Sequence, residues 1–357
     1  MEKILEGIKV LELASVLAGP SVGMFFSELG AEVIKVENAP AGGDATRKWK
    51  VEGEDPALPV SAYFASINYK KQYVFKDLRN PQHLEEVFEL ARQSDVLISN
   101  FKTGDAEKFG VEYAKVKAIN PRIVYAHLRG FDSDIHRAGY DVIAQAETGY
   151  MSMNGTPESG PLKFPVAIID ILAAQQLKEG IMVGLWRRER SGKGCYVETS
   201  LEAAGLASLV NQASAYLMYD KVPLPTGSMH PGICPYGDTF SCSDGKPIVL
   251  AVGTDKQFAK LCRLLGEPEL SADSRFSTNP ARVVNRVALS EELARLFLLH
   301  QRDTIMQQLI AEDVPAGAIR DLSEVFAGEF AKSMVLEETI DGVPTRRVKT
   351  VAFRMEE

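Results

Sequence analysis

Short β-rich runs alternate with helical segments over the first half of the chain, and this alternation limits the possible folds more than any other feature. The periodicity predicts strands and helices in turn over residues 8–13, 20–29, 31–36, 73–75, 83–92, 95–98 and 122–128. Such alternation is typical of a parallel, doubly wound α/β sheet. Ligands of these sheets bind beyond the carboxyl ends of the strands, so the loops that follow residues 13, 36, 98 and 128 are the expected place for a site.

The second half of the chain has a different pattern of predicted elements. Helices are predicted over residues 140–151, 171–190 and 201–219, and a strand over 195–199, before a stretch rich in Pro and Gly at 220–236. Such a density of helix and strand breakers marks a linker or a loop at a site. A hairpin (239–241 and 247–252), helices (257–265, 289–299 and 303–310) and C-terminal strands within 339–354 are predicted beyond it. A chain of 357 residues is long enough for two domains.

Charge and cysteine content exclude several classes of function. The net charge is −8 and no long run of one sign occurs, which argues against binding to nucleic acid or to a membrane surface. The four cysteines contain no C-x-x-C pair, so a reducing compartment and no structural metal are expected. The first residues lack an apolar stretch of the signal-peptide kind, and a cytoplasmic location is predicted.

The common catalytic and cofactor motifs are absent from the sequence. No G-x-G-x-x-G follows the first strand and no phosphate-binding loop of the Walker type occurs, which disfavours enzymes that use nicotinamide cofactors or nucleoside triphosphates. Neither H-E-x-x-H nor G-x-S-x-G is found, and the five histidines lack the spacing of metal ligands.

Asp170 is the residue that stands out on physical grounds. It is the one acid in the apolar run of residues 166–174, and it lies where the long helix of this region begins. An ionised carboxylate is costly to bury without partners. The pattern alone favours a helix N-cap, whose side chain accepts from free backbone N–H groups. The alternative is a carboxylate nucleophile in a dry cleft.

A series of motifs, each weak alone, occurs in an order that resembles the class III CoA-transferases, also called the CaiB/BaiF family. The similar segments are residues 5–13 (LEGIKVLEL), 18–20 (AGP), 29–37 (LGAEVIKVE), 43–47 (GDATR), 94–101 (SDVLISNF), 108–110 (KFG), 139–141 (GYD), the region of Asp170, 190–194 (RSGKG), and 230–231 (HP) with 235–236 (PY). Together they cover most of the chain.

The resemblance implies that the chain is an acyl-CoA:carboxylate CoA-transferase with Asp170 as its nucleophile. In this family the carboxylate forms an acyl–aspartyl anhydride and then an aspartyl-CoA thioester, and an acyl-CoA and a carboxylic acid are the substrates. Tyr140 and Asp141 are implied to line the acyl pocket. CoA is implied to bind at Val16, Leu17, Ala18, Arg79, Asn100, Phe101, Lys108 and Phe109, with cations at the phosphates and aromatic rings at the adenine.

Two departures from the family pattern bear on the chemistry. Leu17 stands where formyl-CoA transferase has a glutamine, which implies a more apolar acyl pocket and makes oxalate an unfavourable acceptor. Tyr140 stands where α-methylacyl-CoA racemase, a sibling with the same fold, has a histidine base. A racemase therefore remains as an alternative that lacks one of its two bases. A CoA-binding protein without turnover is a second alternative.

The family resemblance also implies an arrangement of domains and subunits. A large CoA-binding domain of Rossmann type takes residues 1–220 and is completed by 326–357, while a smaller α+β domain with its linkers takes 221–325. Two chains are implied to interlock as a homodimer. The donor and acceptor acids are not identified by the sequence.

Overall fold

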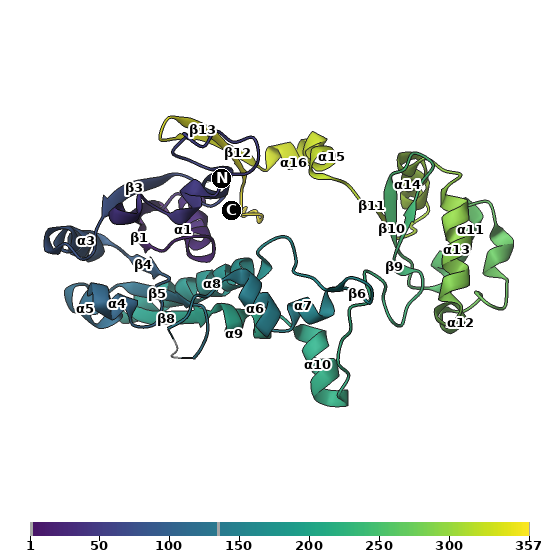
Figure 1. Ribbon diagram of the computed structural model, residues 1–357, viewed down its shortest axis with the longest axis horizontal. Coiled ribbons are helices and arrows are strands. Elements are labelled where there is room, and N and C mark those ends of the chain that lie inside the picture. Colours follow the sequence, from purple (N-terminus) through teal and green to yellow (C-terminus); the bar gives the residue numbers. More distant parts are fainter. Residues whose placement is uncertain (1–2, 134–135, 357) are drawn as a thin grey trace. The chain divides into compact units, whose positions relative to one another are not determined.

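The computed structural model describes residues 3–133 and 136–356, and the chain forms two compact units (Figure 1). The first unit comprises Met1–Ser152, Leu162–Pro223 and Met334–Glu357, and the second comprises Met153–Pro161 and Leu224–Ser333. The short segment Met153–Pro161, which lies within the predicted large domain of residues 1–220, belongs to the second unit.

A six-stranded parallel sheet forms the centre of the first unit. Its spatial order is β3-β2-β1-β4-β5-β8, and every neighbouring pair is parallel. This is the Rossmann-like order, in which the chain reverses direction across the sheet between β1 and β4. The α/β prediction is thereby confirmed. The strands are β1 (Lys9–Leu13), β2 (Glu32–Asn38), β3 (Lys71–Lys76), β4 (Val96–Ser99), β5 (Val124–Arg129) and β8 (Cys195–Ser200).

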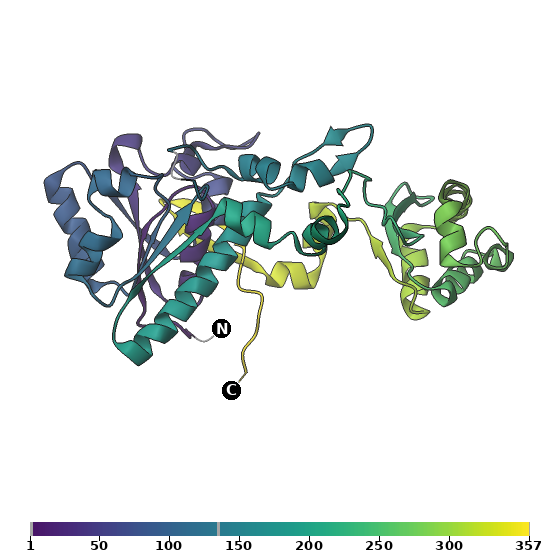
Figure 2. The same ribbon diagram turned by 90° about the horizontal axis from the view of Figure 1, so that it is seen from below.

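Helices cover both faces of this sheet (Figures 1 and 2). On one face α1 (Ala18–Glu28) and α8 (Ile168–Ser191) pack on Val10 and Ile98, and on the other α3 (Pro81–Gln93) and α5 (Tyr113–Ile119) pack on Leu11. Successive strand residues point to opposite faces, so a strand buried on both faces reads as an unbroken apolar run. This explains why the strands could be recognised from their sequence.

Three details of the first unit differ from the predicted elements. Helix α1 begins at Ala18, so Pro20 is its third residue rather than its first; the missing N–H is still harmless, because first-turn N–H groups have no intrahelical partner. The helix expected over 140–151 is two helices, interrupted at Gly149 with a φ of 89°. The helix expected over 201–219 is also divided, into Leu201–Ala207 and Val210–Tyr219, and Val210 at the break has a left-handed φ of 39°.

The remaining helices of this part of the chain are short. They are α2 (Ala62–Ser66), α4 (Asp105–Phe109), α6 (Asp141–Glu147), α7 (Tyr150–Met153), α9 (Leu201–Ala207) and α10 (Val210–Tyr219), with 3₁₀ turns at η1 (Ala39–Ala41) and η2 (Ala45–Lys48). Within the two described ranges, no helix is both long and apolar enough to cross a bilayer.

The second unit is built on a small antiparallel sheet of β9 (Tyr236–Ser241), β10 (Pro247–Ala251) and β11 (Ala316–Ala318). The predicted hairpin is confirmed, with Gly245 in its turn at a φ of 73°. Around this sheet lie α11 (Asp255–Leu264), η3 (Pro268–Ser271), α12 (Asn279–Val284), α13 (Arg286–Phe297), α14 (Arg302–Ala311), α15 (Leu322–Ala327) and α16 (Glu329–Ser333), and the unit also contains the strand pair β6 (Gly155–Thr156) and β7 (Gly160–Pro161).

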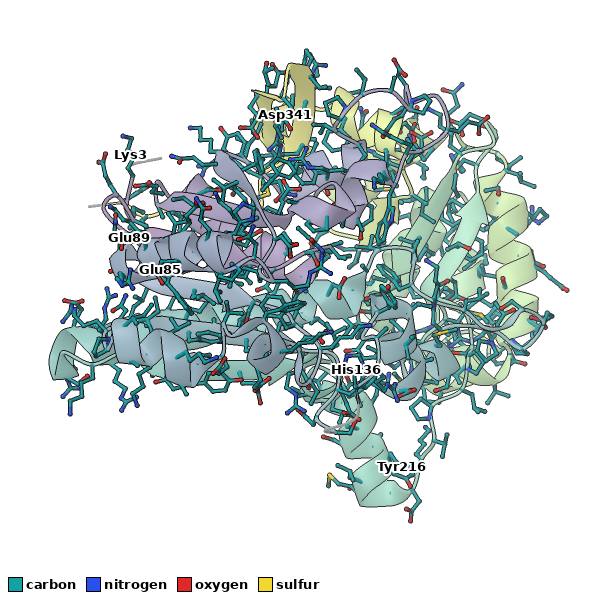
Figure 3. The ribbon with its side chains drawn as sticks, turned by 60° about the vertical axis from the view of Figure 1, so that its left-hand side comes forward. Lys3, Glu85, Glu89, His136, Tyr216 and Asp341 are labelled. Atoms are coloured by element: carbon teal, nitrogen blue, oxygen red, sulfur yellow. The ribbon has the colours of Figure 1, made fainter. Side chains whose placement is uncertain are left out.

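A C-terminal hairpin returns to the first unit. Its strands are β12 (Val335–Ile340) and β13 (Val343–Val348), and Ile340 packs with Phe64 of α2. Asp341 is labelled in its turn in Figure 3. The strands predicted within 339–354 are therefore only partly correct, since the hairpin begins at Val335 and ends at Val348.

Candidate active site

Two cavities of the first unit lie beyond the carboxyl ends of the sheet strands, where ligands of such sheets bind. The first, here the Asp170 cavity, has a volume of about 190 Å³ and lies beyond β1, β4 and β5. It is lined by residues 15–18, 100–103, 128–131 and 137–140 together with Asp170 and Leu201. The second, the Arg79 cavity, has a volume of about 620 Å³ and lies beyond β1, β2 and β3. Ser15 and Phe101 line both cavities, which are therefore neighbours.

Asp170 is the buried acid of the first cavity. Its exposed fraction is 7%, and among the described residues none donates a hydrogen bond to its carboxylate. Burial, and after it the negative charge of Asp141, raises the pKa of Asp170 to about 7. A carboxyl group in this state alternates between acid and base near neutral pH, as expected of a reactive group rather than of a structural ion.

Asp141, and not Asp170, caps the long helix. Helix α8 begins at Ile168 and its N-cap is Ala167, so Asp170 is the third helical residue and the N-cap interpretation of Asp170 is wrong. Oδ1 of Asp141 accepts from the backbone N–H of Ile169 at 2.8 Å and of Asp170 at 3.4 Å. A cap supplied by another helix is invisible in the local sequence. Asp141 does not line the Asp170 cavity, whereas Tyr140 does.

The turn between β1 and α1 forms one wall of the Asp170 cavity. Asn100 holds this turn from β4, because its side chain accepts from the N–H of Ser15 at 3.0 Å and donates to the carbonyl of Ser15 at 2.8 Å. Val16 has a φ of 72°, a left-handed conformation that is unusual for a β-branched residue. Leu17 and Ala18 begin α1, and the first N–H groups of a helix have no intrahelical partner.

The Arg79 cavity brings together the charged and aromatic residues predicted to bind CoA. Arg79, Lys108, Phe101 and Phe109 all line it. The two phenylalanine rings lie 5.7 Å apart, and the ammonium of Lys108 lies 5.7 Å from the ring of Phe109. The guanidinium of Arg79 is exposed and oriented by Asp77. Cations beside aromatic rings suit a nucleotide with phosphate groups.

The sequence gives no signal for some residues in or near the Asp170 cavity. The charges of Asp170 and Asp141, added to the larger effect of burial, raise the pKa of Tyr63 to about 12, and no sequence signal pointed to this tyrosine. Arg137 and Lys102 line the Asp170 cavity. Asp44 lies in the GDATR motif, which was recognised without a role for its aspartate. Across the described ranges, no group of His, Cys, Asp or Glu side chains is arranged to hold a metal ion.

The first unit combines a Rossmann-like sheet with a buried carboxylate in one cavity and a larger cavity beside it, and comparisons with known proteins identify the family. The model of CoA-transferase family III matches residues 5–357, and the chain belongs to this family. It is thus a class III CoA-transferase, an enzyme that moves CoA between an acyl-CoA and a carboxylate.

Several relatives of the chain are named as CoA-transferases. The chain is 36% identical over 355 residues to the succinate–glutarate CoA-transferase of Agrobacterium fabrum, covering 97% of this chain and 88% of the relative. It is 32% identical over 327 residues to the acetyl-CoA:oxalate CoA-transferase of Acetobacter aceti, covering 89% and 81%. A crystal structure of a CaiB/BaiF family protein from Brucella suis is 39% identical and superposes with a TM-score of 0.88, covering 100% of this chain and 94% of that one. Transfer is therefore favoured over the racemase and over binding without turnover.

Proposed function

We propose that the chain exchanges CoA between two dicarboxylic acids through acyl intermediates on Asp170. The observation that carries the proposal is the buried Asp170 carboxylate, which lacks a hydrogen-bond donor among the described residues and lines a cavity at the end of the sheet. Cationic side chains of Lys102, Arg129 and Arg137 line the same cavity and suit the second carboxylate of such an acid. Succinate, glutarate and mesaconate occur in the names of several relatives.

The exchange proceeds in four balanced steps. The Asp170 carboxylate attacks the thioester carbonyl of the donor, the C–S bond breaks, and CoA leaves as a thiolate beside an acyl–aspartyl anhydride. The thiolate attacks the aspartyl carbonyl, which releases the donor acid and leaves an aspartyl-CoA thioester. The acceptor carboxylate attacks the carbonyl of that thioester, the C–S bond breaks, and CoA leaves again as a thiolate beside a second anhydride. The returning thiolate then attacks the acceptor carbonyl, giving the new acyl-CoA and free Asp170.

A carboxylate suits this sequence because each intermediate is itself an activated acyl group. Anhydride and thioester are both strong acyl donors, so that the next nucleophile can displace each of them, whereas a serine ester would be too stable a resting state. In the folded chain the ionised, attacking form of Asp170 predominates only above a pH of about 7. Backbone N–H groups of the turn at Leu17 and Ala18 are suited to stabilise the developing oxyanion.

The CoA moiety occupies the neighbouring Arg79 cavity in this proposal. Arg79 and Lys108 contact the phosphate groups, and Phe101 and Phe109 contact the adenine. Asn100 and residues 16–18 guide the pantetheine toward Asp170, and Tyr140 contacts the acyl group. This arrangement is supported by the adjacency of the two cavities, which share Ser15 and Phe101.

Chemical trapping of the intermediate tests the proposal. The protein is incubated with succinyl-CoA, treated with hydroxylamine and digested, and the mass of the peptide that contains Asp170 is measured. A hydroxamate on Asp170 is expected in the native protein and none in Asp170→Asn. Asp141→Asn, which retains an acceptor oxygen for the cap of α8, is the matched control and should keep the adduct. An unmodified Asp170 peptide, together with full transferase activity in Asp170→Asn, would sink the proposal.

The interlocked homodimer is part of the same proposal. Helix α10 carries exposed apolar side chains, among them Leu217 at 79% and Tyr219 at 75% exposure, and Tyr216 on the same helix is labelled in Figure 3. A second chain that covers this surface would remove it from water. Sedimentation should give twice the 39.1 kDa chain mass, and Leu217→Asp should lower the dimer fraction. A native protein that sediments as a monomer contradicts the dimer.

The location of the enzyme in the cytoplasm is likewise proposed. All four cysteines are free thiols, and Cys234, Cys242 and Cys262 are buried. Free thiols suit a reducing compartment. Fractionation of the source cells with an antibody to the protein would test this.

A further inference from the structure

A group of buried charges lies directly beneath the turn that lines the Asp170 cavity. This group, here the charge network, consists of Glu12, Lys35, Asp44 and Lys71, all of them buried. The ammonium of Lys35 lies 2.8 Å from Glu12 and 3.0 Å from Asp44, and that of Lys71 lies 2.8 Å from the other oxygen of Glu12. The four side chains thus form one connected chain of ion pairs from Asp44 to Lys71.

The charge network contacts the backbone of the turn at three points. Lys35 donates to the carbonyl of Ala14 at 2.6 Å, before the turn. Lys71 donates to the carbonyl of Pro20 at 2.8 Å, in the first turn of α1. Between them, the N–H of Val16 donates to Asp44, at 3.2 Å from Oδ2 and 3.4 Å from Oδ1.

The contact at Val16 falls on the strained residue of the turn. A β-branched residue at a φ of 72° persists only where its surroundings enforce it. Asp44 is itself fixed from the opposite side: Oδ1 accepts from both the N–H and the hydroxyl of Thr46, and the N–H of Asp44 donates to Glu37 at 2.6 Å. The acceptor of the Val16 N–H is therefore held by three further hydrogen bonds.

Glu37, which accepts from the N–H of Asp44, forms an ion pair with Arg47. Arg47 donates to both carboxylate oxygens of Glu37 and to Asp341, which is labelled in the C-terminal hairpin in Figure 3. Buried ion pairs contribute little net stability, because removing the charges from water costs about as much as their attraction returns. Stability alone therefore does not explain why these charges are buried. Their contacts with the backbone of the turn suggest another role.

We propose that Asp44 is a positioning residue for the transfer reaction, holding Val16 in its left-handed conformation so that the turn keeps its shape beside Asp170. This inference rests on the proposed function of the Asp170 cavity. Asp44 acts through the turn and contacts no reacting atom. Its removal lets the Val16 backbone relax to negative φ, which moves the N–H groups of Leu17 and Ala18 away from the positions that favour acyl transfer.

A double-mutant cycle in the full chain tests the mechanism. Asp44→Ala, Val16→Gly and the double variant are compared in the steady-state transfer of CoA from succinyl-CoA to glutarate. Glycine adopts positive φ without strain, so the turn of Val16→Gly depends less on Asp44. We expect Asp44→Ala to lower kcat about tenfold or more in the native chain, and by only about threefold in the Val16→Gly background, while KM for succinyl-CoA changes less than kcat.

Glu12→Gln is the matched control, because it removes a charge of the same network and leaves the bond between Asp44 and Val16 in place. Its effect on kcat should be equal in the native chain and in the Val16→Gly background. An equal loss of kcat from Asp44→Ala in both backgrounds would mean that Asp44 has only a structural role, and the proposal would be overturned.

Hydrogen–deuterium exchange tests the conformation of the turn independently of enzyme activity. Exchange in the peptide over residues 14–20 should be faster in Asp44→Ala than in the native chain. If that variant does not fold, Asp44→Leu, whose side chain is of similar size but has no acceptor oxygen, replaces it in both measurements. Unchanged exchange in the folded variant refutes the role of Asp44. A native protein that forms no adduct on Asp170 refutes the proposed function instead, so the two failures are distinguishable.

Discussion

Asp44 and Asp170 are both buried acids of the first unit, yet their surroundings shift their pKa values in opposite directions. Burial alone would raise the pKa of Asp44, but the charge of Lys35 and the hydrogen bonds of Thr46 hold that pKa below its usual value. Within residues 3–133 and 136–356 no ion pair involves Asp170, and burial and Asp141 raise its pKa to about 7. One carboxylate is fixed as an ion by its partners, and the other is left able to react.

In the proposed mechanism these two acids have different roles, because Asp44 supports the turn and Asp170 reacts. A carboxylate whose lone pairs are occupied by Lys35, Thr46 and Val16 is a poor nucleophile but a rigid acceptor. A desolvated carboxylate without donors keeps its lone pairs available for attack. Replacement of each acid should therefore have a different consequence for activity and for stability.

The largest effect is expected when the proposed nucleophile is replaced. Asp170→Asn should lower kcat by about 10⁴-fold or more, because an amide cannot form the anhydride. The change should not destabilise the fold, since it removes a buried charge that forms no ion pair with any described residue. Steady-state transfer assays and thermal unfolding of the same preparations measure both. An Asp170→Asn variant that is less stable than the native chain but keeps its activity would contradict the proposed roles of the two acids.

The pH dependence of stability follows from the raised pKa of Asp170. Between about pH 4 and pH 7 the folded chain holds a proton that the unfolded chain has released, so this group's contribution to the free energy of unfolding falls as the pH rises. The rise from 3.8 to about 7 corresponds to about 4 kcal/mol at most. Urea unfolding at pH 5 and pH 8 should differ less in Asp170→Asn than in the native chain, and an identical difference would refute the raised pKa.

The rate of acylation should follow the same ionisation in the opposite sense. Attack requires the carboxylate, so the single-turnover rate with succinyl-CoA should increase as the pH rises through about 7. Asp141→Asn removes a negative charge near Asp170 and should move the midpoint to lower pH. A midpoint that stays in place in this variant would show that burial alone sets the pKa.

Asp44 should behave in the opposite way to Asp170 in stability measurements. Asp44→Ala leaves Lys35 with a single carboxylate and removes the acceptor of Val16, so the free energy of unfolding should fall by about 3 kcal/mol. Asp170→Asn at pH 8 should leave it unchanged or raise it. Chemical denaturation of both variants at that pH measures the difference. An equal decrease in the free energy of unfolding in the two variants would contradict the different roles of the two acids.

The smallest effect is expected at the neighbouring Arg79 cavity. Arg79 is exposed and paired with Asp77, so its replacement by alanine should weaken CoA binding only about five- to tenfold. Calorimetry with CoA at two salt concentrations measures the change, which should be smaller at high salt. Lys102→Ala, at a cation of the Asp170 cavity, is the control and should affect the acceptor KM more than CoA affinity.

Parts of the fold and site were predictable because they leave a local trace. The strands buried on both faces are apolar runs, and the order of motifs along the chain indicated the family before any geometry was known. Asp170 attracted attention because an acid interrupts an apolar segment. The interruptions of two predicted helices, at Gly149 and Val210, could not be predicted as reliably, because backbone conformation there depends on contacts with other segments.

The sequence by itself determined the α/β class, the family and the identity of the acid at position 170. Only the tertiary structure decided that Asp141 caps α8 and that Asp44 holds Val16, since the partners are separated by 28 residues in each case. Hydrogen bonds between distant segments have no periodicity in the sequence, so a role of this kind appears only when the sheet brings the segments together. The same packing decides the charge of Asp170, because desolvation is a property of the cavity and not of the residue.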